Sequence, residues 1–416
     1  MIQAPKGTFD VLPPDAERRS ILEAQARKIL GAAGYKRIET PVFESTELFA
    51  RGVGEATDIV QKEMYTFEDD GGRSLTLRPE GTAPVCRAYI EHGMHKLSQP
   101  VKFWYLESFF RTEQPQKGRY RQFWQVGAEA IGTDAPEADA ELIVLLAELL
   151  EAMVVKGVHL RLSSLGSPET RLEYRERLTA YLHGHEDELA PEVRTRIDLN
   201  PLRAFDSSHP GTRSVMAGAP KLLDQLSTED EEHFVGVREL LDAADVRYEI
   251  DSTLVRGIDY YTRTLFEFTS DVLGAQSAVG GGGRYDRLIE QIGGSPTPGC
   301  GWATGVERIL LSGAQAPTAP DPVDLFIALQ VHETSSATAA FVLSREARRA
   351  GLAAQFELAG RSLKGQLKQA DRIGARFVAI LDGDGEATLR DMTSGEQTEL
   401  ALSAVIPAVL RGSRLT

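Results

Sequence analysis

The 416-residue sequence predicts two folded units of different class, an α+β domain on an antiparallel sheet over residues 1–320 and a small α/β domain with a mixed sheet over residues 324–416. Three observations predict this division. The Pro-rich segment 314–323 (AQAPTAPDPV) is typical of an interdomain linker. Before it, strand-like runs outnumber crossover helices, whereas helical and strand-like runs alternate after it. A chain of this length also exceeds one ordinary hydrophobic core.

In the first unit, apolar spacing predicts a helix over residues 16–33 and a long apolar helix over residues 138–155. Between these helices, residues 109–129 form two strand-like runs around a polar loop with Pro115 and Gly118, which predicts an antiparallel hairpin. The stretch of about 168–234 is polar, charged and helix-prone. We interpret it as a helical insertion in the first unit.

In the second unit, the pattern predicts a strand at 325–329, a helix at 338–351, a short strand at 353–358, a basic helix and a buried strand at 376–381. The basic helix repeats cations at helical spacing, with Asp371 the only acid among them. Those cations are Arg361, Lys364, Lys368, Arg372 and Arg376. Two interpretations are open at this point, a solvated helix face or a surface that faces phosphates.

The net charge of −15 argues against a protein that coats nucleic acid non-specifically. The charge is uneven, because residues from 325 onward carry 11 Lys/Arg and 10 Asp/Glu. No window is apolar enough to span a bilayer and the start is unlike a signal peptide, so we expect a cytoplasmic protein without membrane contact. The two cysteines, Cys86 and Cys300, have no metal-ligand spacing. We expect buried thiols and no metal site built from protein side chains.

The predicted hairpin carries the richest set of polar side chains. A period of two places Arg111 and Glu113 on one face of the first strand. It places a second row on one face of the other strand, namely Arg121, Phe123, Gln125, Gly127 and Glu129. Charge, an aromatic plane and an amide together favour an anionic ligand with a flat base, while a purely structural hairpin is the alternative.

Three further segments are candidates for a ligand site. LVRGIDYYTRT places Arg256 beside Tyr260 and Tyr261, which suggests a polar pocket, although each residue alone is usually structural. Four glycines, 280–283, either open the backbone to a ligand or form a flexible hairpin, and they match neither a Walker loop nor a dinucleotide fingerprint. GWATGVER places Arg308 near the start of a helix, where phosphates bind well.

Glu80 and Thr82 lie in LRPEGTAP, at a predicted turn before a helix. Ligand binding and capping of the helix explain Thr82 equally well.

Taken in order, these motifs resemble those of histidyl-tRNA synthetases, a family of class II aminoacyl-tRNA synthetases, over essentially the whole chain. Pro41 in IETPVFE resembles the dimer-interface motif 1, FRTE through RYRQFWQ resembles motif 2, and GWATGVER resembles motif 3. LVRGIDYYTRT and GGGGRYD are similar to the two histidine signatures that separate this family from other class II enzymes. The resemblance implies the class II synthetase fold, followed by an anticodon-binding domain from residue 324.

The resemblance also implies roles for the candidate residues. Histidine would be bound by Glu80, Gly81, Thr82, Arg111, Gln125, Glu129, Arg256, Tyr260 and Tyr261. A neutral imidazole presents one donor and one acceptor, so Glu129 and a tyrosine hydroxyl would read both. ATP would be bound by Arg111, Glu113, Arg119, Arg121, Phe123 and Arg308. Transfer RNA would contact Gln116, Lys117, Lys364 and Lys368.

The reaction implied is ligation of L-histidine to tRNA(His) through a histidyl-adenylate. The histidine carboxylate would attack the α-phosphorus of ATP, with Arg111 and Arg256 as the catalytic cations and Mg²⁺ screening the pyrophosphate. A cytoplasmic homodimer is expected. The rivals are a regulatory subunit of ATP phosphoribosyltransferase, which typically lacks the first histidine signature and the anticodon domain, a class II synthetase for another amino acid, and an RNA-binding module without catalysis.

Overall fold

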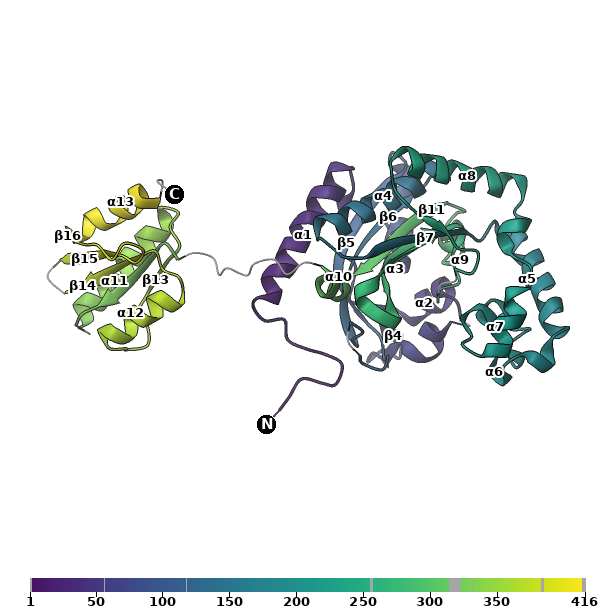
Figure 1. Ribbon diagram of the computed structural model, residues 1–416, viewed down its shortest axis with the longest axis horizontal. Coiled ribbons are helices and arrows are strands. Elements are labelled where there is room, and N and C mark those ends of the chain that lie inside the picture. The colour runs from purple at the N-terminus through teal and green to yellow at the C-terminus, as the bar shows by residue number, and fades with distance from the viewer. Residues whose placement is uncertain are drawn as a thin grey trace. The chain divides into compact units, whose positions relative to one another are not determined.

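The computed structural model describes residues 2–55, 57–116, 118–254, 257–313, 323–331, 333–382 and 385–413. The chain divides into two compact units, Met1–Ala316 and Pro317–Thr416 (Figure 1). Within the described residues, no helix is long and apolar enough to cross a membrane.

The first unit is built on a largely antiparallel sheet. In the described part of the chain its eight strands lie in the order β1-β5-β6-β11-β10-β9-β7-β8. They are β1 (Lys36–Arg37), β5 (Val101–Phe110), β6 (Gln122–Ile131), β11 (Gly299–Gly305), β10 (Ala278–Arg284), β9 (Thr262–Ser270), β7 (Val158–Ser164) and β8 (Glu249–Ile250). Only the outer pairs β1–β5 and β7–β8 are parallel. The predicted antiparallel α+β class is therefore confirmed.

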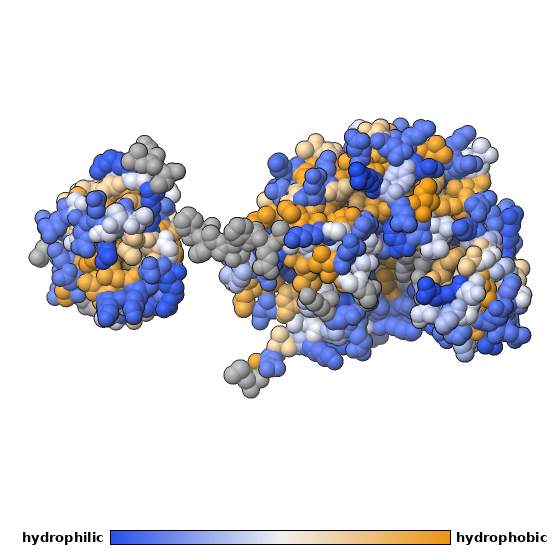
Figure 2. All heavy atoms as spheres, viewed as in Figure 1, coloured by the Kyte–Doolittle hydropathy of each residue, from blue (hydrophilic) through white to orange (hydrophobic). Residues whose placement is uncertain are grey.

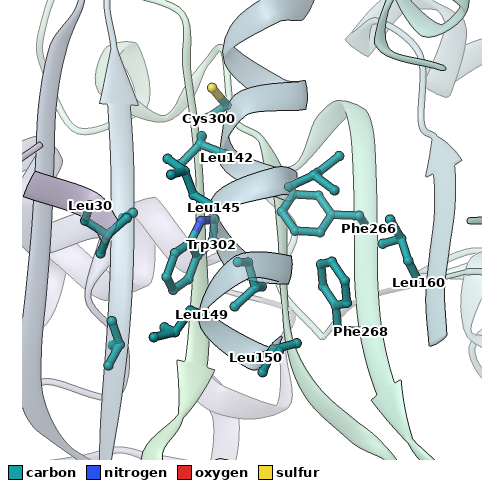
Figure 3. Packing of buried hydrophobic residues seen from close by; sticks show 14 of the residues in the cluster. Leu30, Leu142, Leu145, Leu149, Leu150, Leu160, Phe266, Phe268, Cys300 and Trp302 are labelled. Carbon is teal, nitrogen blue, oxygen red and sulfur yellow. The ribbon is translucent and has the colours of Figure 1, made fainter. Parts of the chain in front are cut away.

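Three helices cover one face of this sheet: α1 (Asp15–Ala32), α4 (Pro136–Ala152) and α8 (Thr228–Ala243). Helix α4 begins with proline and carries Glu137 and Asp139 in its first turn, which suits the positive end of the helix dipole. Its leucines pack on Trp302 of β11 and on Phe266 and Phe268 of β9 (Figure 3). Residues at even positions of β6, such as Val126 and Ala128, point into the same core.

The opposite face of the sheet carries smaller elements and is left partly open. Helix α3 (Thr82–Glu91) packs there together with α9 (Leu288–Gln291) and the 3-10 helix η2 (Met94–Lys96). A small sheet of order β2-β4-β3 lies beside them. Its strands are β2 (Phe43–Ser45), β4 (Ser74–Leu77) and β3 (Tyr65–Glu68), and it is joined to α2 (Thr46–Val53) and the π-helix η1 (Ile59–Glu63). Residues at odd positions of β5 and β6 face this side, and these positions include the candidate site residues.

Between β7 and β8 the chain forms a run of helices, as predicted for the insertion. They are α5 (Pro168–His183), η3 (Glu186–Glu188), α6 (Pro191–Arg194), η4 (Pro201–Asp206), α7 (Pro210–Ala217), η5 (Leu222–Gln225) and α8. Helix α8 returns this run to the sheet, where it packs on α4. The visible surface over α5, α6 and α7 is largely hydrophilic (Figure 2). Strand β9 is followed by η6 (Asp271–Gln276), and β11 is followed by α10 (Val306–Ser312).

The second unit is a mixed five-stranded sheet in the described residues, in the order β13-β12-β14-β15-β16. The strands are β12 (Leu325–Leu329), β13 (Ala354–Phe356), β14 (Phe377–Leu381), β15 (Glu386–Asp391) and β16 (Gln397–Ala401). The helices are α11 (Thr334–Arg349), α12 (Leu363–Arg372) and α13 (Leu402–Ser413). Helices α11 and α13 cover one face, and α12, the predicted basic helix, covers the other. The mixed sheet is confirmed.

Candidate active site

The open face of the large sheet holds an enclosed pocket of about 70 Å³, which we call the inner pocket. Strands β5, β6, β10 and β11 form its floor, the start of α3 forms one wall, and Tyr260 and Tyr261 form another. Both tyrosines are only 5% exposed, and their rings meet edge to face with centroids 4.8 Å apart. Residues 80–82, Gln125, residues 260–261 and Gly281, far apart in the chain, thus meet around one small volume.

Glu129 of β6 lies fully buried behind the lining of this pocket. Its carboxylate accepts hydrogen bonds from Tyr285 Oη at 2.6 Å, Thr82 Oγ1 at 2.9 Å and Tyr105 Oη at 3.3 Å. Burial raises the pKa of Glu129 to about 8 despite these donors, with the nearby Glu80 acting in the same direction. A carboxyl group that resists ionisation therefore lies directly behind the pocket lining, surrounded by hydroxyl groups.

The space for these side chains is made by glycines on neighbouring strands. A Cβ atom at Gly127 would lie 2.1 Å from Cζ of Tyr105, and one at Gly301 would lie 1.7 Å from Oε2 of Glu129. The four glycines 280–283 belong to β10, which is paired on both sides inside the sheet. The alternative of a flexible hairpin is therefore wrong, because the glycines sit in a buried central strand.

Glu80, and not Thr82, caps the start of helix α3. The Glu80 carboxylate accepts from the backbone N–H groups of Thr82 and Ala83 at 2.8 and 2.9 Å, so Glu80 caps helix α3. The Thr82 hydroxyl instead donates to Glu129. Capping by Thr82 is therefore wrong, because the longer side chain of Glu80 reaches the first N–H groups from outside the helix. Tyr260 Oη lies 3.4 Å from Glu80 Oε2, and burial raises the pKa of Glu80.

A larger cavity of about 400 Å³, the outer cavity, opens beside the inner pocket. Phe123 of β6 lines it, and the Arg111 guanidinium lies 5.4 Å from the Phe123 ring centroid. Arg308 of α10 lines the other side and donates to the carbonyls of Gly118, at 3.2 Å, and Ala278. Cationic groups and an aromatic face line one cavity, which suits a nucleotide.

Arg111 and Gln125 line both the inner pocket and the outer cavity, so the two volumes meet at these side chains. Arg111 Nε donates to the Pro79 carbonyl at 2.9 Å, which fixes the guanidinium at the junction. Gln125 Oε1 is buried and accepts no hydrogen bond from the described residues. A buried acceptor without a donor is costly in a folded protein, which indicates that a ligand supplies the donor.

The loop between β5 and β6 differs from the predicted strand faces. Arg111, Glu113 and Arg121 lie outside the strands, so the period of two does not govern them. Arg119 Nε contacts Glu113 Oε2 beside the outer cavity, and Gln116 pairs with Arg119 at the exposed loop tip. Arg121 does not line the cavity, because its guanidinium donates to the carbonyls of Glu113 and Lys6.

Two expected site residues, Arg256 and Lys117, lie outside the described residues. In the second unit, Lys364 and Lys368 are exposed on α12, and neither has an ion pair within the described residues. Arg361, expected within the basic helix, lies before the start of α12 and pairs with Glu357. An exposed basic surface is therefore present on α12.

Several site residues were not singled out from the sequence. Tyr105 and Tyr285 both donate to Glu129. Once β5 and β6 are known to pair, the period of two identifies Tyr105, which lies opposite Gly127. Arg203 of the helical insertion lines the outer cavity, and no local signal marks it.

A nucleotide-sized cavity that meets a small amino-acid-sized pocket on an antiparallel sheet is the arrangement of a class II aminoacyl-tRNA synthetase.

Comparisons with known proteins specify the family. The model of the family described as histidyl-tRNA synthetase matches residues 7–309, and that of the anticodon binding domain matches residues 326–411. A histidine–tRNA ligase of Desulfitobacterium hafniense is 46% identical over 96% of both chains, and one of Halothermothrix orenii is 45% identical over 97% of this chain and 98% of the relative. The crystal structure of apo S. aureus histidyl-tRNA synthetase is 34% identical with a TM-score of 0.81, covering 98% of this chain and 100% of that one. The chain belongs to the histidyl-tRNA synthetase family.

Proposed function

We propose that this chain joins L-histidine to tRNA(His) in two steps, with ATP consumed in the first. The observation that carries the proposal is the meeting of the inner pocket and the outer cavity at Arg111 and Gln125. A histidine in the inner pocket would present its carboxylate at the junction, next to the α-phosphate of an ATP in the outer cavity. Because that carboxylate is ionised at neutral pH, positioning and charge stabilisation are sufficient for the first step.

In the inner pocket, the imidazole would lie against Glu129 and one of the tyrosines 260 and 261, so that its donor and its acceptor both have partners. The histidine α-amino group would donate to Glu80 and to Gln125 Oε1, which has no donor among the described residues. Glycine at position 81 lets Tyr105 keep its place beside the pocket, because a Cβ atom at Gly81 would lie 2.5 Å from the Tyr105 ring. An apolar amino acid would leave these buried groups without partners, and the pocket would reject it.

In the outer cavity, the adenine would stack on Phe123 and meet Glu113, and Arg308 and Arg119 would hold phosphates. Arg111 would contact the α-phosphate and the histidine carboxylate together. Arg121 would act indirectly, by holding the loop through its bond to the Glu113 carbonyl. Arg256 would stabilise the pentavalent phosphorus, a role that rests on the family resemblance alone. The tRNA 3′-hydroxyl would then attack the adenylate carbonyl, while Gln116, Lys117, Lys364 and Lys368 would contact the tRNA.

Magnesium is part of the proposal as a companion of ATP. The described residues hold no group of three or more metal-ligating side chains, but Mg²⁺ usually needs only one or two carboxylates besides phosphates. Glu63 and Glu267 line the outer cavity and could supply them. Burial and the neighbouring Glu113 raise the pKa of Glu63, as expected for a carboxyl group that a cation would stabilise. When bound, Mg²⁺ would screen the charge of the leaving pyrophosphate.

The proposal includes a homodimer located in the cytoplasm. Phe43 and Phe67, on the small sheet that follows Pro41, are 50% and 43% exposed, and their rings lie 6.0 Å apart. Such an exposed aromatic pair suits burial against a second copy. Sedimentation of the purified protein tests the dimer, and a fully active monomer would refute it. Cell fractionation tests the location.

The first experiment is ATP–pyrophosphate exchange with each of the twenty amino acids, together with tRNA charging by the same preparation. Exchange and charging confined to histidine would support the proposal. Folded protein without any exchange would favour a regulatory or RNA-binding role. Arg256→Ala should keep ATP binding and lose exchange, and near-normal exchange would remove Arg256 from the mechanism.

A further inference from the structure

We propose that Arg203, a residue of the helical insertion, binds the triphosphate of ATP, and that Asp58 holds its guanidinium at the cavity until ATP arrives. The inference rests on the proposed function, because it assigns one more cation to the same nucleotide cavity. It gives the insertion a direct part in the first step of the reaction.

The position of Arg203 is the first observation. It lies on η4, inside the run of helices between β7 and β8, yet its side chain lines the outer cavity together with Arg111 and Arg308. Nη2 of Arg203 lies 3.2 Å from Oδ2 of Asp58, which directly precedes η1 and is 145 residues earlier in the chain. The ion pair therefore joins the insertion to the body of the catalytic unit at the edge of the cavity.

The backbone that presents Arg203 is well anchored. Ala204 is 2% exposed and belongs to the same apolar cluster as the buried face of α5. The Arg203 backbone N–H donates to the Asn200 carbonyl at 3.2 Å. The main chain is therefore held by packing, while the long side chain beyond it is the part that can turn from one partner to another.

The charge balance of the cavity is the second observation. Among the described residues, its lining contains four arginines and five carboxyl-bearing side chains. The arginines are Arg111, Arg119, Arg203 and Arg308, and the acids are Asp58, Glu63, Glu113, Glu267 and Glu307. A triphosphate gains a more favourable field here when arginines turn from protein acceptors to phosphate oxygens. Glu307 is already held by Arg19, which does not line the cavity, so this acid would remain neutralised in part.

Arg203 and Asp58 are suited to such an exchange because their ion pair is accessible to water. Their side chains are 33% and 45% exposed. By contrast, Arg111 is 19% exposed and is tied to the Pro79 carbonyl. Water-exposed ion pairs contribute little to stability, so losing this one to a more highly charged phosphate partner costs little. Asp58 thus keeps the guanidinium near the cavity without binding it tightly.

The test compares the two partners of one ion pair in ATP–pyrophosphate exchange with histidine. Arg203→Ala should raise KM for ATP roughly tenfold or more, as expected for the loss of a charged hydrogen bond, and should leave KM for histidine unchanged. Asp58→Ala should lower KM for ATP by about twofold to threefold, because it removes one acceptor that competes with phosphate for the Arg203 guanidinium. If the pair served only to fasten the insertion, both variants would change KM for ATP in the same direction, and that result would overturn the proposal.

Arg196→Ala is the matched control, because Arg196 is an exposed arginine of the same insertion that lines a neighbouring pocket and not the outer cavity. It should leave KM for ATP unchanged. An equal rise in Arg196→Ala and Arg203→Ala would indicate a general charge effect and contradict a specific contact, as would a defect of Arg203→Ala confined to transfer onto tRNA. Wild-type protein without histidine-dependent exchange would refute the proposed function itself, whereas active wild type with an unaffected Arg203→Ala variant would refute only the present inference.

Discussion

Tyr285 Oη donates a hydrogen bond of 2.6 Å to Oε2 of Glu129, which joins the histidine signature GGGGRYD, just after β10, to strand β6. The bond places a phenol against a fully buried carboxyl group whose pKa burial raises to about 8. Burial thus favours the protonated form of Glu129 in the unliganded pocket. If histidine binds in this pocket as proposed, its imidazole and Glu129 would share one proton between them.

The raised pKa of Glu129 predicts a loss of stability with rising pH. The stabilising contribution is fully present below the ordinary glutamate value of 4.5 and is lost as pH rises through about 8, because the folded state opposes ionisation. The effect is on the order of a few kcal/mol, since one pKa unit corresponds to about 1.4 kcal/mol. In the Glu129→Gln variant, this part of the dependence of the unfolding free energy on pH should be absent. All three tryptophans, Trp104, Trp124 and Trp302, lie in the catalytic unit, so their fluorescence follows its unfolding.

The measurement is denaturant unfolding of wild type and Glu129→Gln between pH 5 and pH 9. Titrating groups far from Glu129 contribute equally to both proteins, so the difference between the two curves reports on Glu129 and the neighbours coupled to it. Parallel curves would show that Glu129 ionises as easily in the folded protein as in the unfolded chain. Histidine-dependent exchange should fall strongly in the variant, because an amide cannot share a proton with the imidazole.

The sequence predicted the parts of the fold that have a local signature. Helix α4 has a proline at its start and apolar residues on one face, and strands β12 and β14 are short apolar runs bounded by polar residues. Strands β15 and β16 and helix α13 were not predicted. Strand β16 is mostly exposed, and α13 contains Pro407, so neither has the pattern of a buried strand or a regular helix.

Within the site, residues in recognisable motifs were found and those that depend on pairing were not. Tyr105 is a site residue only because β5 pairs with β6 in a register that sets it opposite Gly127. Arg203 reaches the cavity only because the insertion folds back toward η1. The spacing of residues within one sequence segment predicts neither the register of β5 and β6 nor the path of the insertion. The strand-face argument failed at Arg121 for a related reason, since the chain leaves the sheet before that residue.

Gly127→Ala should destroy the histidine pocket while the sheet stays folded. The added Cβ would lie 2.1 Å from Cζ of Tyr105, so the ring would have to move into the inner pocket. We expect the kcat/KM for histidine in exchange to fall about 100-fold or more, because displacing groups that position a substrate by about 1 Å costs that much. Gly31→Ala, in helix α1 with no atom within 4 Å of the new Cβ, is the matched control and should leave exchange unchanged. Normal histidine kinetics in Gly127→Ala would show that Tyr105 does not need its present position.

Asp139→Asn should destabilise the catalytic unit more than any surface change. Asp139 Oδ1 accepts from Arg284 Nη2 at 2.8 Å, and Oδ2 lies 2.7 Å from His233 Nε2 and 2.6 Å from Thr264 Oγ1. Both Asp139 and Arg284 are buried, so neutralising one leaves an uncompensated charge and costs about 3–5 kcal/mol. Tryptophan fluorescence in urea measures the loss. Glu47→Gln, at an exposed helix pair with Arg51, should change stability by less than about 0.5 kcal/mol. Equal midpoints for the two variants would mean that the buried network contributes nothing.

Charge reversal on α12 should separate the two steps of the reaction. Lys364 and Lys368 are exposed on the α12 face of the second unit, so Lys364→Glu with Lys368→Glu should weaken tRNA charging roughly 10-fold to 100-fold, with a steep dependence on salt. ATP–pyrophosphate exchange needs no tRNA and should be unchanged.

Arg349→Glu is the control, because Arg349 is exposed at the end of α11, which covers the other face of the same sheet. If it reduced charging as much as the double variant, net charge rather than the α12 surface would govern tRNA binding. A parallel loss of exchange and charging in the double variant would mean that these lysines act on the catalytic unit and not on tRNA.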